Sequence, residues 1–136
     1  MLDVIRVLIV DDESDILTAF KKQLTRDGME VVCASCASEA LCVVQKENFD
    51  VAVLDIKLPD LDGVELLSRI KQIEPATEII MLTGFASLET AIRSMKQGAY
   101  DYLTKPCKIA ELKKAILKAY DKKILREKTI VLEEQL

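Results

Sequence analysis

Five short apolar segments alternate along the chain with five segments whose apolar residues recur at helical spacing. The apolar segments are Val4–Val10, Glu30–Ala34, Val51–Leu54, Glu78–Leu82 and Ala99–Leu103; the helical ones are Ser14–Arg26, Ser38–Lys46, Val64–Ile73, Leu88–Gln97 and one that begins near Ile109. The apolar segments show little polar alternation, as expected for strands of a parallel sheet with helices on both faces. The chain is therefore predicted to be an α/β protein, a (βα)5 doubly wound fold with a five-stranded parallel sheet.

The last helix is longer than this fold requires. It runs from Ile109 to Leu136, 28 residues, and would be about 42 Å long if fully helical. We expect a domain over residues 1–121 and a helical extension or linker over residues 122–136. The extension could be solvated, bind a partner or lead to another domain.

Composition excludes several classes of protein. The 136 residues are 50% hydrophobic and 31% charged, with a net charge of −4, so a disordered tail or a nucleic-acid-binding chain is not expected. No apolar run reaches the roughly 20 residues that cross a bilayer, and the start lacks signal-peptide features. We expect a cytoplasmic location. The sequence contains no P-loop and no helix-turn-helix candidate.

Four cysteines admit a plain interpretation. Cys33 and Cys36 have C-x-x-C spacing, with Cys42 and Cys107 elsewhere, and the chain has no histidine. A zinc site would need a second such pair or histidines, and a redox pair would need a helix N-terminus. Small, reduced, partly buried side chains are the expectation.

Polar residues follow four of the predicted strands. Asp11-Asp12, Asp55, Thr83 and Lys105 come at or just after the carboxyl ends of their strands, where ligands bind in open parallel sheets. Clustered carboxylates repel one another unless a cation neutralises them, and oxygen ligands without histidine or thiolate favour Mg²⁺. The set therefore indicates phosphoryl transfer to an aspartate.

Each of these residues also has an ordinary structural interpretation. Asp12 or Glu13 could cap the first helix and Ser38 the second, and Thr83 could serve a turn. Lys105 could lie in a solvated loop. Their convergence at one sheet edge, rather than any single residue, favours function.

With these residues the chain resembles a known family, the receiver domains of bacterial two-component response regulators. The resemblance covers roughly residues 4 to 119 and rests on Asp11-Asp12, Asp55 with Pro59 and Gly63 after it, Thr83-Gly84 and Lys105-Pro106. It implies a flavodoxin-like strand order 2-1-3-4-5 and a cis peptide between Lys105 and Pro106.

The resemblance also implies roles for individual residues. Asp55 is the expected phosphoacceptor, and Mg²⁺ is expected to be held by Asp11, Asp12, Asp55 and the main-chain oxygen of Lys57. Lys105 and Thr83 are expected to contact the phosphoryl group, and Thr83 and Tyr102 to form the switch.

Residues 83–106 look most like the nitrogen-regulation subfamily, whose members usually join the receiver to a sigma-54-activating ATPase and a DNA-binding domain. The implied function is a phosphorylation-dependent switch that passes the signal to dimerisation or to an output domain in transcription regulation. The implied partners are a sensor histidine kinase and a second copy, bound through the last helix and the neighbouring face. No membrane or direct nucleic-acid contact is expected, nor enzymatic activity beyond assisting the domain's own phosphorylation and dephosphorylation.

Three alternatives stay open. A stand-alone receiver could act through protein–protein interaction alone. A phosphatase with an Asp nucleophile would want a second Asp two residues after Asp55, where this chain has Lys57. A flavin-binding module would want a phosphate-cradling loop after the first strand, where the chain instead has the acidic residues 11–13.

Overall fold

The computed structural model describes residues 3–135 and contains alternating strands and helices. In chain order these are β1 (Arg6–Val10), α1 (Ser14–Arg26), β2 (Glu30–Ala34), α2 (Ala37–Lys46), β3 (Val51–Leu54), α3 (Gly63–Ile73), β4 (Glu78–Thr83), α4 (Leu88–Lys96), β5 (Asp101–Thr104) and α5 (Ile109–Gln135). Every predicted element is present. The described helices include none that is long and apolar enough to span a membrane.

The strand boundaries differ from the prediction mainly at β1 and β5. The pairing of β1 begins at Arg6 rather than Val4, which is half exposed. Strand β5 begins at Asp101 rather than Ala99, because the Ala99 N–H donates to the Ser94 carbonyl at the end of α4. Ala99 is apolar and buried, so its side chain alone did not distinguish a strand from a helix-terminating turn.

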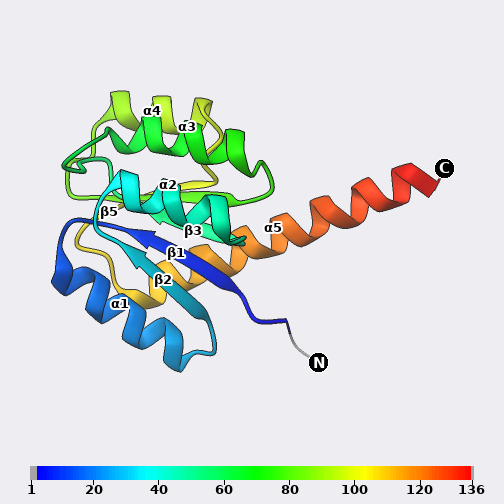
Figure 1. The fold of residues 1–136 in the computed structure, drawn as a ribbon, viewed down its shortest axis with the longest axis horizontal. Coiled ribbons are helices and arrows are strands. Elements are labelled where there is room, and N and C mark those ends of the chain that lie inside the picture. Colours follow the sequence, from blue (N-terminus) through cyan, green and yellow to red (C-terminus); the bar gives the residue numbers. More distant parts are fainter. Residues whose placement is uncertain (1–2, 136) are drawn as a thin grey trace.

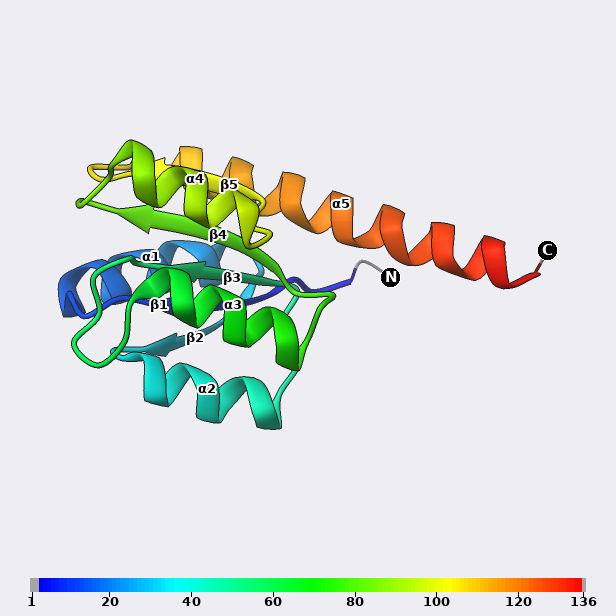
Figure 2. The same cartoon turned by 90° about the horizontal axis from the view of Figure 1, so that it is seen from above.

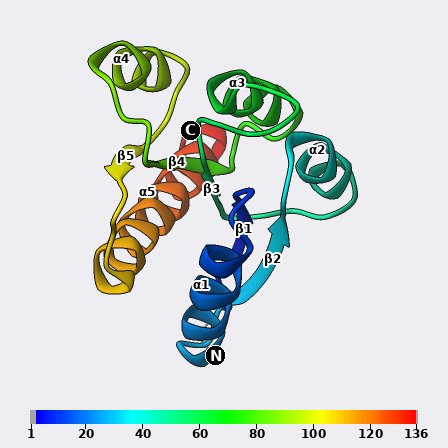
Figure 3. The same ribbon diagram turned by 90° about the vertical axis from the view of Figure 1, so that its left-hand side faces the viewer.

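All five strands are parallel, in the order β2-β1-β3-β4-β5. This confirms the predicted doubly wound, flavodoxin-like topology. Figure 3 shows α2, α3 and α4 on one side of the sheet and α1 and α5 on the other. A separate apolar cluster lies on each side, so the strands between are buried on both faces. Burial on both faces explains why β1, β3 and β4 are almost continuously apolar.

The side chains predicted to cap α1 and α2 do not do so. Ser38 does not cap α2: Cys36 is the N-cap residue, without a side-chain cap bond. The Asp60 carboxylate instead accepts hydrogen bonds from the Ala37 and Ser38 N–H groups, each at 2.9 Å. Neither Asp12 nor Glu13 caps α1 through its side chain, although Glu13 is the N-cap residue. The carboxylates of Asp12 and Glu13 are therefore not used in capping α1.

The cysteines are free thiols. Cys33 lies in β2, and burial raises the pKa of its thiol, which disfavours the thiolate that redox chemistry uses. Cys36 and Cys107 are also half-buried, whereas Cys42 is exposed and departs from the expected partial burial.

Helix α5 extends well beyond the sheet. Its fully buried residues end at Ala119, and from Leu125 onward its described side chains are exposed. Figures 1 and 2 show the remaining turns projecting away from the sheet as one continuous helix. The 27 residues from Ile109 to Gln135 correspond to about 40 Å of helix.

Candidate functional site

The carboxyl ends of the strands bring four predicted residues together. Asp11 follows β1, Asp55 follows β3, Thr83 ends β4 and Lys105 follows β5. Asp11 and Asp55 are each 2% exposed and Thr83 is fully buried. Two carboxylates this deeply buried need compensating positive charge.

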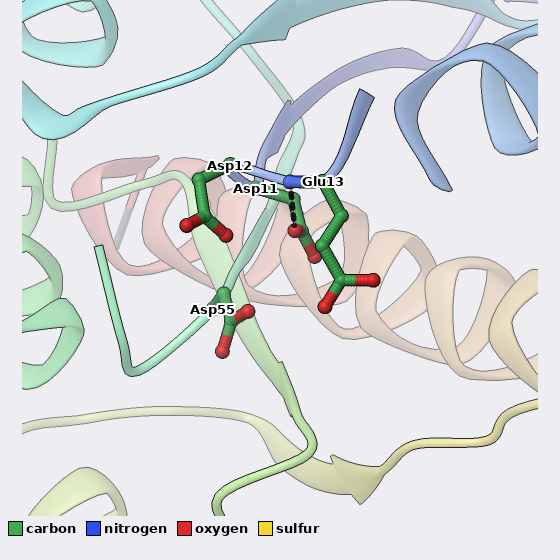
Figure 4. A group of neighbouring side chains, drawn as sticks. All are labelled: Asp11, Asp12, Glu13 and Asp55. Atoms are coloured by element: carbon green, nitrogen blue, oxygen red, sulfur yellow. Dashed lines mark hydrogen bonds between the residues drawn. The ribbon is translucent and has the colours of Figure 1, made fainter. Parts of the chain in front are cut away.

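A group of four carboxylates forms the acidic part of the site. Ligand-capable oxygens of Asp11, Asp12, Glu13 and Asp55 all lie within 4.8 Å of one another, with Asp12 and Glu13 exposed (Figure 4). Burial raises the pKa of the Asp11 carboxyl, although hydrogen bonds from Lys105 and from the Glu13 N–H oppose this rise. An all-oxygen donor set open to solvent on one side fits a hard divalent cation that retains some of its water.

Lys105 is the cation that joins three of these carboxylates. Its Nζ lies 2.7 Å from Asp11 Oδ2, 3.0 Å from Asp55 Oδ2 and 3.3 Å from Glu13 Oε1. Burial lowers the pKa of this ammonium, but the bonds to Asp11 and Asp55 outweigh it and the net shift is upward. The Lys105-Pro106 peptide is cis, as the resemblance implied.

Glu13 is a member of the site that was not among the predicted site residues. Its carboxylate contacts Lys105 and belongs to the acidic group. The available signal was its position directly after Asp11-Asp12, at the end of the same strand.

The segment after Asp55 turns back tightly over it. The Lys57 N–H points to Asp55 Oδ1 at 3.4 Å, and the Gly63 N–H donates to the Ile56 carbonyl at 2.7 Å. The Lys57 ammonium lies 4.4 Å from the centre of the Phe85 ring, a cation–π contact between the segments after β3 and β4. Lys57 and Phe85 therefore flank the site.

Thr83 takes part in a local turn, and its main-chain carbonyl accepts a 2.8 Å hydrogen bond from the Lys105 N–H. Its hydroxyl accepts a hydrogen bond from the Phe85 N–H at 3.0 Å. This confirms the structural interpretation of Thr83 as a turn residue. A hydroxyl that accepts one bond still has its proton to donate.

Tyr102 lies on the same face of the sheet as Thr83. The register pairs Thr83 with Thr104, and residues two apart on a strand share a face. The Tyr102 hydroxyl is 2.7 Å from Thr90 Oγ1 and accepts a longer bond, 3.4 Å, from the Ser87 N–H. Tyr102 is thereby attached to the first turn of α4, a contact that no local sequence pattern indicates.

Residues 7–117 match the family described as the response regulator receiver domain. The chain belongs to this receiver-domain family. A receiver domain protein from Methanospirillum hungatei JF-1 has a similar structure, with a TM-score of 0.89, 39% identity, and coverage of 91% of this chain and 99% of that one.

Longer proteins contain similar receiver domains. The alginate biosynthesis transcriptional regulatory protein AlgB of Pseudomonas aeruginosa is 34% identical over 96% of this chain and 29% of its own length. The transcriptional regulatory protein ZraR of Salmonella typhimurium is 36% identical over 85% and 26%. NtrX of Brucella abortus has a TM-score of 0.89, 32% identity, and coverage of 96% of this chain and 30% of its own. The chain thus spans less than a third of these relatives, which agree with the resemblance to the nitrogen-regulation subfamily.

Proposed function

We propose that this receiver domain accepts a phosphoryl group on Asp55 from a sensor histidine kinase. The observation that carries the proposal is the Lys105 ammonium, held between the buried carboxylates of Asp11 and Asp55 within the four-carboxylate group. The chain has no histidine, so the donor is a separate kinase or a small acyl phosphate. An Asp55 carboxylate oxygen attacks phosphorus, the donor's P–N or P–O bond breaks, and an acyl phosphate forms.

The residues around Asp55 bind the metal ion and the phosphoryl group. Asp11, Asp12, Asp55 and the Lys57 main-chain oxygen would hold Mg²⁺, which when bound neutralises charge on the phosphoryl oxygens. Lys105 provides positive charge on the opposite side, and the Thr83 hydroxyl donates to a phosphoryl oxygen. These residues assist only the domain's own phosphorylation and dephosphorylation.

The signal then leaves through Thr83 and Tyr102. Thr83 moves toward the new phosphoryl group, and Tyr102 turns inward from its position against α4. The change reaches a homodimer interface on α5 and the neighbouring face, or an output domain beyond residues 1–121, to which residues 122–136 are the linker. The size of the transcriptional regulators AlgB and ZraR supports a longer protein of this kind.

Incubation with acetyl phosphate tests the proposal. With Mg²⁺, intact mass is expected to rise by one phosphoryl group, and hydroxylamine is expected to remove it because it cleaves acyl phosphates. EDTA should suppress the labelling, since the clustered carboxylates would otherwise repel the phosphate. Labelling that persists in EDTA or resists hydroxylamine contradicts the proposal.

Thr83→Ala is expected to separate phosphorylation from its consequence. The variant should retain most of its labelling, because Asp55 and Lys105 are unchanged, yet lose whatever shift in sedimentation beryllofluoride produces in the parent. Alanine has no hydroxyl to move toward the phosphoryl group. Tyr102 should therefore stay bonded to Thr90 and Ser87 in this variant. Analytical ultracentrifugation with and without beryllofluoride measures this.

Thr104→Ala is the matched control, because Thr104 pairs with Thr83 in the sheet but is exposed. It should respond to beryllofluoride as the parent does. An undiminished shift in Thr83→Ala would remove Thr83 from the switch.

A further inference from the structure

Two adjacent lysines of α5 contact acidic residues at the opposite end of the sheet from the phosphoacceptor. The Lys123 ammonium lies 3.0 Å from Asp50 Oδ1 and 2.9 Å from Glu127 Oε1. The Lys122 ammonium lies 3.4 Å from Glu78 Oε2. Asp50 directly precedes β3 and Glu78 is the first residue of β4, so both lysines face the amino ends of central strands.

The acidic partners are themselves fixed. Asp50 accepts a 2.8 Å hydrogen bond from the Arg6 N–H through its second oxygen, and its side chain is only 20% exposed. Glu78 is 1% exposed; its Oε1 lies 3.8 Å from the Lys71 ammonium, and its Oε2 has no hydrogen-bond partner within the described chain. A carboxylate buried to this degree is stable only beside positive charge, and Lys122 supplies that charge to Oε2.

Both lysines have further contacts that restrain them. The Lys122 ammonium lies 5.4 Å from the centre of the Tyr100 ring. The Lys123 side chain is 15% exposed; burial lowers the pKa of its ammonium, but Glu127 and Asp50 outweigh this and raise it. Lys123 therefore stays charged and paired under ordinary conditions.

The lysine contacts lie where α5 leaves the domain. They occur directly after Ala119, the last fully buried residue of α5. Beyond this point α5 is separated from the base of the sheet by a groove of about 490 Å³ lined by Arg6, Phe49, Lys123 and Glu127 among others. Apolar packing decreases beyond Ala119, and a helical segment without tertiary packing has little stability of its own in water.

We infer that Lys122 and Lys123, with Glu78 and Asp50, form an ionic clamp that fixes the direction in which α5 leaves the domain. The extension is then a rigid arm attached to β3 and β4, not a flexible linker. The clamp does not depend on phosphorylation of Asp55, so it stands apart from the proposed function and is tested on unphosphorylated protein.

The test is the double variant Lys122→Met/Lys123→Met, which keeps the aliphatic stems and removes both charges. Hydrogen exchange of backbone amides 121–130 is expected to become roughly fivefold faster, the effect of losing one to two pairs of this kind. Amides 110–119, within the domain, should show a smaller change than amides 121–130. Residual dipolar couplings from residues 109–119 and 124–132, which fit one alignment tensor in the parent, should then require two.

Lys113→Met is the control, because Lys113 also pairs from α5, at 3.4 Å to Asp27, but within the domain. Glu78→Gln provides a second variant that removes one acidic partner and is expected to loosen the arm in the same sense. Unchanged exchange and a single tensor in the double variant overturn the clamp. Equal loosening by Lys113→Met also overturns it, because the effect would then be general to α5.

Discussion

Asp55→Asn is expected to reduce phosphoryl incorporation from acetyl phosphate to about one hundredth of the parent level or less. The amide keeps the size of the carboxylate and can still contact Lys105, but it is a far weaker nucleophile and lacks the negative charge that would help bind Mg²⁺. Mass spectrometry of the intact protein, followed by peptide mapping, measures both extent and position.

Asp15→Asn is the matched control. Asp15 is an exposed carboxylate in the first turn of α1, near the site but outside the group of four clustered carboxylates. It should label as the parent does. Hydroxylamine-sensitive labelling that survives Asp55→Asn at parental levels would assign the acceptor role to a different carboxylate.

Gly63→Ala is expected to lower the free energy of unfolding by about 3 kcal/mol or more. A Cβ at this position would lie 1.9 Å from the Asp55 carbonyl oxygen and 2.7 Å from Ile56 Cα. Both neighbours are backbone atoms between β3 and α3, so the clash cannot be relieved by a side-chain rotation. Thermal unfolding followed by circular dichroism should show a melting temperature about 10 °C lower.

Gly84→Ala separates a steric cause from a general cost of replacing glycine. A Cβ on Gly84 would have only side-chain atoms of Lys105 nearby, at 3.9 Å. We expect a change within about 0.5 kcal/mol, as for an ordinary surface substitution. Similar losses in the two variants would show that close approach to Asp55 is not what requires glycine at position 63.

The alternation of apolar and helical segments was enough to predict the elements and the doubly wound sheet, because both periodicities are local. The same locality explains the errors. Ala99 is buried in either a strand or a turn, and only its bond to Ser94 identifies the turn. Ser38 has the right side chain to cap α2, but the carboxylate of Asp60, a residue far along the sequence, accepts the hydrogen bonds of the first N–H groups instead.

The site was predictable for a different reason: the carboxyl ends of parallel strands meet at one edge whatever the helices between them do. This rule predicts from the sequence that Asp11, Asp55, Thr83 and Lys105 lie at the same edge. The rule does not predict contacts that depend on how far individual side chains extend. The bond between Glu13 and Lys105, and the attachment of Tyr102 to Thr90, belong to that class.

Helix α4 differs from the other helices in that it fully buries no apolar side chain. Its only fully buried side chain is Ser94, while Leu88, Ile92 and Met95 face solvent. Few apolar contacts would be lost if this helix detached, so locally open states of α4 should lie closer in free energy to the native state than those of α3, which buries five residues. Thermal fluctuation alone should therefore visit rearranged positions of α4, and a small change at Thr83 would need only to select among them.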